Sequence, residues 1–401
     1  MKDIENSKKE APFIGLTGMG GGVASLMWRG ASSDGPFSLW VMGSGEYGML
    51  AQNNQTHYSS PRQIPGEWQK IAGGEQTCQC MGAIKPDGTL WTWGRNNNGM
   101  LGLNNETDYS SPKQVGTDTT WAQISCQDGG LIATKTDGTL WTWGANDYGQ
   151  LGHSNNNNYS SPKQVGSDTN WGTESYHMTG GYYNCAAIKT DGTLWKWGGN
   201  GSGELGQNNR TNYSSPTQVG TSTDWAGVAD GQGNQFRAVK TDGTGWTGGA
   251  ASLGVSGLPS NTRYSSPTQL GTIVHFPTSN HVASPGVQFW SDTRTTSLYV
   301  TGYNAQGGTG TNSTNDRFGI ANWTVPSGGT GWKDYSVDAA ERFAGGVRTD
   351  GTMWTWGNNS YGQLGQNNET NRSSPVQLGT DTDWWQFKCL ANNSFMLRDN
   401  L

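Results

Sequence analysis

Histidine and cysteine, the residues that most often carry catalysis or bind metals, are few in this chain and widely spaced. The histidines are His57, His153, His177, His275 and His281. None of them forms a His-x-x-x-His pair. Cys78-Gln79-Cys80 has the spacing of a metal clip, but no second Cys or His pair follows at zinc spacing. We interpret these two cysteines, together with Cys126, Cys185 and Cys389, as buried small hydrophobic residues and predict no metal site.

Sequence motifs for nucleophilic or phosphate chemistry are also missing. The chain has no Gly-x-Ser-x-Gly turn and no Gly-Lys-Ser/Thr phosphate loop. Serine and aspartate are so abundant that a chance approach of Ser, His and Asp carries little information. We therefore predict a protein that is not an enzyme and that uses no cofactor.

The bulk composition indicates an ordered chain built on aromatic packing. Of 401 residues only 32% are hydrophobic, but 62 are glycine and 20 are tryptophan, whose large rings bury much area each. The net charge of −6 is mild and no Lys/Arg-rich stripe occurs, which disfavours a nucleic-acid partner. The polar first ten residues do not resemble a secretory signal, and no apolar run could cross a bilayer. We expect synthesis in a cytoplasm and no membrane insertion.

One eight-residue sequence motif, which we call the phrase, recurs along the whole chain. Asp-Gly-Thr-Leu-Trp-Thr-Trp-Gly occupies residues 87–94 and 137–144, and near copies occupy 191–198 and 350–357. The aromatic residues that mark the copies are 50 to 55 residues apart: Trp40, Trp91, Trp141, Trp195, Trp246, Tyr299 and Trp354. A period near fifty residues indicates a solenoid, an array or a propeller.

One period reads as four short β-strands. The strand-like runs of the second copy are separated by turn residues, and the Asp-Gly pair predicts a tight hairpin before each marker strand. We predict an all-β fold, a seven-bladed β-propeller of four-stranded antiparallel blades. Residues 1–11 are predicted to be a polar tail and 12–401 a single propeller. The ring is closed by N- and C-terminal strands, but one strand pair is surplus: the two ends share the closing blade, or one pair caps it.

The loop after each marker strand carries a family resemblance. Gly-Gln-Leu-Gly at 149–152 and 362–365 continues the phrase Trp-x-Trp-Gly-x-Asn. With the period, this resembles the regulator-of-chromosome-condensation repeat family of seven-bladed propellers. The resemblance implies the fold; the family includes a nucleotide-exchange factor for a small GTPase, ubiquitin-ligase modules and an enzyme inhibitor. The segment Tyr-Ser-Ser-Pro-Lys-Gln-Val-Gly, which occurs at 109–116 and at 159–166, is also similar to sequences in repeat proteins of marine bacteriophages.

Candidate binding residues follow from where the pattern fails. One face of the disc should carry the Asp-Gly turns, whose aspartates we interpret as turn residues. The opposite face should carry the long Asn-rich loops. There the connections 250–266, 277–285 and 303–324 of repeats five and six are irregular, by divergence for binding or by drift. Aromatic and Arg residues are typical of binding hot spots, so the predicted site is Arg263, Tyr264, His281, Tyr303, Arg317, Phe318 and Trp323.

Three functions remain open. The first is a protein–protein interaction propeller, a structural or host-attachment component of a phage virion, with virion proteins or a host surface component as partner. The second is a carbohydrate-binding, lectin-like propeller. The third is a regulatory module, either an exchange factor for a small GTPase or an enzyme inhibitor.

Overall fold

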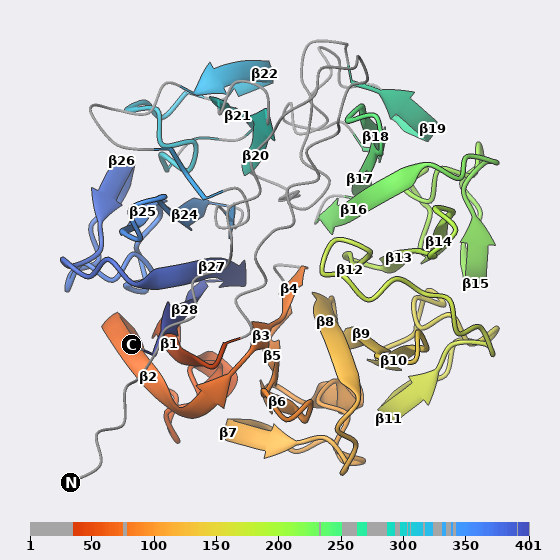
Figure 1. Ribbon diagram of the computed structural model, residues 1–401, viewed down its shortest axis with the longest axis horizontal. Coiled ribbons are helices and arrows are strands. Elements are labelled where there is room, and N and C mark those ends of the chain that lie inside the picture. Colours follow the sequence, from red (N-terminus) through yellow and green to blue (C-terminus); the bar gives the residue numbers. More distant parts are fainter. Residues whose placement is uncertain are drawn as a thin grey trace, which may run out of the picture. The chain divides into compact units, whose positions relative to one another are not determined.

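The computed structural model describes residues 35–74, 78–231, 234–250, 263–270, 287–292, 297–302, 304, 306–315, 317–323, 331–333, 338–339, 342–390 and 392–400. Within these ranges the fold is almost entirely β (Figure 1). The helical elements are two 3₁₀ turns, η1 (Glu46–Gly48) and η2 (Asn97–Gly99). No helix in this part of the chain is long and apolar enough to cross a membrane.

Seven sheets form the propeller, and we number the blades by their marker strands. Blade one contains β27 (Trp384–Leu390), β28 (Asn393–Asp399), β1 (Phe37–Gly43) and β2 (Tyr58–Trp68). Blade two contains β3 (Lys70–Ile71), β5 (Cys80–Ile84), β6 (Leu90–Gly94) and β7 (Tyr109–Gln114). Blade three contains β8 (Trp121–Gln127), β9 (Gly130–Lys135), β10 (Leu140–Gly144) and β11 (Tyr159–Gln164). Blade four contains β12 (Met178–Gly180), β13 (Asn184–Ile188), β14 (Leu194–Gly198) and β15 (Tyr213–Gln218).

The last three blades complete the series. Blade five contains β16 (Trp225–Gly231), β17 (Gln235–Lys240), β18 (Gly245–Gly249) and β19 (Tyr264–Gln269). Blade six contains β20 (Val287–Asp292), β21 (Ser297–Gly302) and β22 (Arg317–Trp323). Blade seven contains β23 (Asp338–Ala339), β24 (Phe343–Val347), β25 (Met353–Gly357) and β26 (Arg372–Gln377). Blade three departs from the predicted pattern, because the short β4 (Gly73–Gly74) adds a fifth strand that runs parallel to β8.

The two ends of the propeller share blade one, which is one of the two predicted ways of closing the ring. The strand order is β2-β1-β28-β27, and β1 pairs with β28 along its full length, from Phe37 opposite Asp399 to Gly43 opposite Asn393. Figure 1 shows this mixed origin as red and blue strands side by side. The surplus N-terminal strand pair, which the sequence predicts at residues 13–16 and 23–27, lies outside the described residues, as do the predicted tail 1–11 and its boundary at residue 12.

The same backbone hydrogen bond joins each blade to the next. An amide in each long loop donates to the carbonyl of the first Ser of the next Tyr-Ser-Ser-Pro or equivalent segment, at 2.6–2.9 Å. The described pairs are Asn53–Ser110, Asn104–Ser160, Ser154–Ser214, Asn208–Ser265, Asn312–Ser373 and Asn367–Ser59. The last pair runs from blade seven to blade one. The described residues therefore show the contact at six blade junctions, including the one that closes the ring.

A glycine makes this close approach possible. Gly99 has φ +72°, and a Cβ placed on it would lie 2.3 Å from the Ser160 Cα of the next blade. No side chain fits at that distance, and L-residues rarely adopt that conformation. Gly48, Gly149, Gly203, Gly307 and Gly362 occupy the same place at other junctions. The recurring Gly and Ser of the sequence are thus explained by the packing of neighbouring blades.

Tryptophan pairs that hold a cation between them lie on six blades. In blade three the Lys135 ammonium is 4.8 Å from the Trp121 ring and 3.8 Å from the Trp141 ring. The same arrangement uses Lys85, Lys189, Lys240, Arg348 and Arg398, at 4.0–5.8 Å from their rings. The rings attract the cation electrostatically, and the pair buries its aliphatic stem. This contact explains why a Lys or Arg precedes the Asp-Gly turn.

The Asp-Gly-Thr-Leu-Trp phrase folds into a chain of hydrogen bonds. In blade three the Thr139 backbone N–H and hydroxyl both donate to Asp137 Oδ1, at 3.0 and 2.7 Å. Trp141 Nε1 then donates to Thr139 Oγ1 at 2.8 Å. The phrases starting at Asp87, Asp191, Asp242 and Asp350 repeat the arrangement. The hairpin and the marker tryptophan are therefore fixed by one local network.

The second tryptophan of the phrase connects blades. Trp143 is fully buried, and its Nε1 donates to the Met100 carbonyl of blade two at 3.1 Å. Trp93, Trp197 and Trp356 make the same bond to their preceding blades. We predict that Trp143→Phe lowers the free energy of unfolding by about 1–3 kcal/mol, because a buried carbonyl loses its donor. Urea denaturation measures the change.

Trp141→Phe is the matched control, because Trp141 Nε1 bonds within its own blade in a partly exposed place. We expect it to cost less than Trp143→Phe. Equal losses for the two variants would contradict a special role for the bond between blades.

Candidate functional site

The long loops and the inner hairpin turns share one face in the regular blades, as the alternation of strands predicts. One pocket is lined by the long loop of blade two, the β8–β9 turn, the long loop of blade three and the β12–β13 turn. On the other face the Asp-Gly turns contact the short turns between blades, since the Trp121 N–H donates to the Gly88 carbonyl at 3.3 Å. We call the first face the long-loop face.

A buried asparagine organises the long loops of blades two, three, four, six and seven. In blade two, Asn96 Nδ2 donates to the carbonyls of Asn105 and Thr107, each at 3.0 Å, and its Oδ1 accepts from the Leu101 N–H at 2.8 Å. Asn146, Asn200, Asn304 and Asn359 repeat this arrangement in other blades. One side chain thus satisfies three backbone groups, and the loops hold a fixed shape.

The repeated tyrosines hold the ends of these loops. Tyr58 and Tyr213 stand at the start of an outer strand, and each hydroxyl accepts from the Nδ2 of an asparagine four residues earlier, at 3.0 Å. Tyr109 and Tyr159 do the same at 3.5 and 3.2 Å. These tyrosines therefore have a structural role in the loops.

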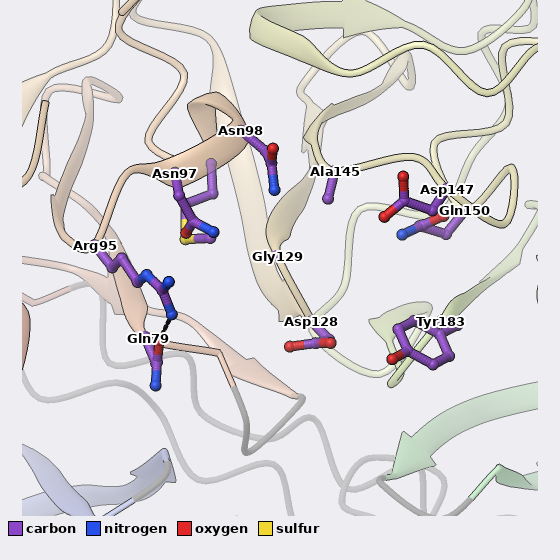
Figure 2. A pocket seen from close by; sticks show the side chains of 11 residues that line it. Gln79, Arg95, Asn97, Asn98, Asp128, Gly129, Ala145, Asp147, Gln150 and Tyr183 are labelled. Carbon is purple, nitrogen blue, oxygen red and sulfur yellow. Dashed lines mark hydrogen bonds between the residues drawn. The ribbon is translucent and has the colours of Figure 1, made fainter. Parts of the chain in front are cut away.

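The pocket on the long-loop face lies where blades two, three and four meet (Figure 2). Its volume is about 270 Å³. Asn97, Asn98 and Met100 line it from blade two, and Asp147 and Gln150 from blade three. Figure 2 shows Arg95 and Gln79 on one side and Asp128, Asp147 and Tyr183 on the other. The walls are therefore polar and carry both signs of charge.

Aromatic side chains stand at one edge of the pocket. Tyr183 stacks on Tyr148 with ring centroids 4.2 Å apart, and Tyr182 lies 4.1 Å from Tyr183. A hydrogen bond with Tyr182, followed by burial, raises the pKa of Tyr183, so its hydroxyl stays protonated. Among the described residues Tyr148 is the exposed large hydrophobic side chain, at 40%.

Arg95 is held in place on the opposite wall. Its guanidinium donates to Gln79 Oε1 and lies 4.8 Å from the ring of Tyr47 in blade one. Both contacts leave the pocket side of the guanidinium facing Asp128 across the cavity (Figure 2). The site is thus pre-formed, as ligand pockets usually are.

The pocket is made of positions that vary between repeats. The phrase Trp-x-Trp-Gly-x-Asn-x-x-Gly-x-Leu-Gly is constant, whereas its variable positions hold Arg95, Asn97 and Asn98 in blade two and Ala145 and Asp147 in blade three. Sequence reasoning missed this site because it searched for irregular blades. The signal that could have found it is variation inside otherwise identical loops.

The aspartates of the other face have structural partners. Asp118, Asp168 and Asp224 pair with Lys135, Lys189 and Lys240 at 2.6–3.0 Å. Burial raises the pKa of Asp118, but hydrogen bonds from Lys135 and Thr120 outweigh it and lower the pKa to about 2. Within the described ranges no cluster of His, Cys, Asp and Glu could hold a metal ion. The interpretation of these aspartates as turn residues is confirmed for the described blades.

All five cysteines are buried and unbridged, as predicted. Cys78 Sγ lies 3.1 Å from Cys80 Sγ, and hydrogen bonds from Cys126 and Cys80 lower the pKa of the Cys78 thiol. These side chains fill the core between blades two and three.

The predicted site residues of blades five and six are only partly described. Arg263 is exposed and Tyr264 begins β19, at the place of the loop-holding tyrosines. Arg317, Phe318 and Trp323 belong to β22, while His281 and Tyr303 lie outside the described residues. A shared binding site for these seven residues stays a prediction.

Comparison with known proteins supports the family resemblance. Residues 87–130, 137–188 and 350–397 match the model of the regulator of chromosome condensation (RCC1) repeat. These three segments are therefore similar to RCC1 repeats. The chain is also 31% identical over 234 residues to the mitochondrial RCC1 domain-containing protein RUG3 of Arabidopsis thaliana. That match covers 55% of this chain and 52% of the plant protein, so it spans about half of each.

Three solved structures share the fold. Yeast RCC1 (Prp20) bound to Kap60 has a TM-score of 0.78 at 16% identity, covering 91% of this chain and 89% of the other. Prp20p from Saccharomyces cerevisiae, described with its binding to Gsp1p and histones, has 0.76 at 17%, covering 91% and 92%. Human WBSCR16 has 0.74 at 15%, covering 90% and 99%. At such identities the likeness shows the propeller fold alone.

His153 gives the long loop of blade three a testable pH dependence. Burial, then the charge of Lys163, lower the pKa of His153 to about 4. The unfolded chain binds this proton below about pH 6.5, so stability should fall as pH drops from about 6.5 to about 4. Gln207 and Gln366 occupy the same place in blades four and seven. We predict that His153→Gln removes this loss of stability. The loss amounts to at most about 3 kcal/mol in the free energy of unfolding at pH 4.

The measurement is the difference in unfolding free energy between the two proteins from pH 7 to pH 4. Carboxylates common to both proteins cancel in that difference. A difference that stays constant across the range would contradict the assignment.

Proposed function

We propose that this chain is a non-catalytic protein–protein interaction module that docks its partner on the long-loop face. The observation that carries the proposal is the division between constant and variable residues on that face. Constant Asn, Gly and Ser residues fix each loop, while variable side chains such as Tyr148 stand exposed on the fixed frame. Rigid scaffolds that present variable loop residues are typical of recognition surfaces.

The chemistry of the exposed residues agrees with this use. Tyr148 is backed by Tyr183, and Asp147 is exposed beside it. Tyrosine and arginine are enriched at the centres of interfaces because they bury large area with a polar end. On the opposite face the Lys and Asp side chains described above are engaged in ion pairs and tryptophan contacts, which leaves them less available for a partner.

Site-specific photo-crosslinking tests the docking face. A photo-reactive amino acid replaces Tyr148 in one variant and the exposed Ser167 of the opposite face in the control. In the cells that naturally express the gene, we expect a defined protein to crosslink at position 148 at least tenfold more than at position 167. Equal crosslinking from the two positions, or none from position 148, would refute the proposal.

A narrower form of the proposal places the module in a phage virion, as a structural or host-attachment component assembled in the host cytoplasm. The near-identity of the repeat sequences supports this form, for example the two identical segments at 109–116 and 159–166. The relatives named above come from cellular organisms and do not bear on it. Purification with particles at fixed stoichiometry supports this form, and recovery only in particle-free lysate removes it.

A regulatory role is the second candidate, because the yeast structure was described with binding to Gsp1p and histones. The net charge of −6 disfavours a DNA backbone as partner, and the GTPase version is the one to test. Nucleotide release from a small GTPase, measured with and without the chain, decides it. A rate equal to the protein-free control removes this candidate.

A further inference from the structure

The pocket contains a buried amide donor that has lost its partner. Gln150 is 2% exposed, and its Oε1 accepts from the Tyr148 N–H at 3.0 Å. Its Nε2 makes no hydrogen bond within the described part of the chain, and Figure 2 shows this amide extending into the pocket. Because this donor opens into the pocket and has no protein partner, a ligand or water in the pocket can pair with it.

Blade seven shows what the missing partner is. Gln363 stands at the same repeat position and also accepts from a tyrosine N–H, that of Tyr361, at 3.0 Å. There Nε2 donates to Asn358 Oδ1 at 3.0 Å. In blade three the residue in the place of Asn358 is Ala145, which has no acceptor and lines the pocket. The change from Asn to Ala thus creates both the space and the free donor.

The groups around this donor define the ligand. Asp147 and Asp128 supply acceptors, and Asn97 and Asn98 supply amides. A ligand hydroxyl can accept from Gln150 Nε2 and donate to a carboxylate at the same time, because O–H is both donor and acceptor. The apolar side chains of Met100 and Ala145 also line the pocket and can contact C–H groups. Several hydroxyls on one side and C–H groups on another describe a sugar ring.

The size of the pocket and its charges limit which ligands can bind. About 270 Å³ lies just under the ~300–1,000 Å³ of pockets for drug-sized ligands, so one or two sugar units fit. Arg95 faces Asp128 and Asp147 across the cavity. A cationic side chain of a protein partner would be repelled by Arg95, and an anionic one by the two aspartates. A neutral polyhydroxylated ligand pairs with both.

We propose that this pocket, at the junction of blades two, three and four, binds a saccharide of one or two pyranose units. Gln150, Asp147 and Asp128 hold its hydroxyls, and Met100 and Ala145 contact its C–H groups. This goes beyond the proposed protein-docking function and does not depend on it. If the crosslinking experiment finds a protein partner but no sugar binds, this inference is refuted and the proposed function stands.

The decisive variant is Ala145→Asn, which restores the blade-seven arrangement and gives Gln150 Nε2 an internal acceptor. Because the chain already uses this pair, we expect the free energy of unfolding to be unchanged or raised. Asn358→Ala is the matched control, since it makes the reverse change outside the pocket. Asp147→Ala, at an exposed position, removes a proposed ligand contact with little risk to folding.

The probes are an array of pyranose oligosaccharides, followed by titration of methyl glycosides of glucose, galactose, mannose and N-acetylglucosamine by saturation-transfer NMR. A glycoprotein tested before and after enzymatic removal of its glycan separates protein-borne from free sugar. We expect at least one sugar to bind the wild type, with affinity reduced about tenfold or more in Ala145→Asn and Asp147→Ala. Asn358→Ala should bind like the wild type.

Absence of binding to any sugar in the array overturns the proposal. So does binding that Ala145→Asn leaves unchanged, because the sugar then lies elsewhere. Equal binding of the glycoprotein with and without its glycan would show that the face recognises protein, which also overturns it.

Discussion

The contact between each long loop and the next blade is the constraint on which the rest of the propeller depends. Its backbone hydrogen bond ends on a Ser carbonyl, and the loop glycine beside it allows no side chain between the two chains. Because this geometry recurs at every described junction, neighbouring blades meet in the same way. The loops between two such contacts are then fixed at both ends, and the buried Asn fixes the middle.

Much of the fold could be predicted from the sequence, because its signals are local. Asp-Gly turns, short strands and a fifty-residue period report on residues close in the chain, and they led to seven blades. Ring closure left two alternatives, since the pairing of β1 with β28 joins residues about 360 positions apart, which no local pattern encodes. The parallel β4 and the cations held between tryptophans also depend on distant parts of the chain.

The site was harder to predict for a different reason. The sequence directed attention to blades five and six, where aromatic and Arg residues replace the pattern, and most of those residues lack a described side-chain environment. The pocket that the structure describes lies in the most regular blades. Its key feature is a single Ala in place of Asn, which looks like ordinary variation until Gln150 and Gln363 are compared in space. Repetition therefore provides an internal reference against which one altered hydrogen bond becomes visible.

The shared blade has a consequence for how the protein is made. Blade one holds β1 and β2 from the start of the described chain and β27 and β28 from its end, so it cannot be completed until β28 has been synthesised. Until then the β1 edge that later pairs with β28 stays open, and an open edge can recruit other chains. Ribosome stalling or C-terminal proteolysis that removes β28 would leave this edge exposed on an otherwise folded chain. Completion of the ring thus depends on β27 and β28, the last two strands of the described chain.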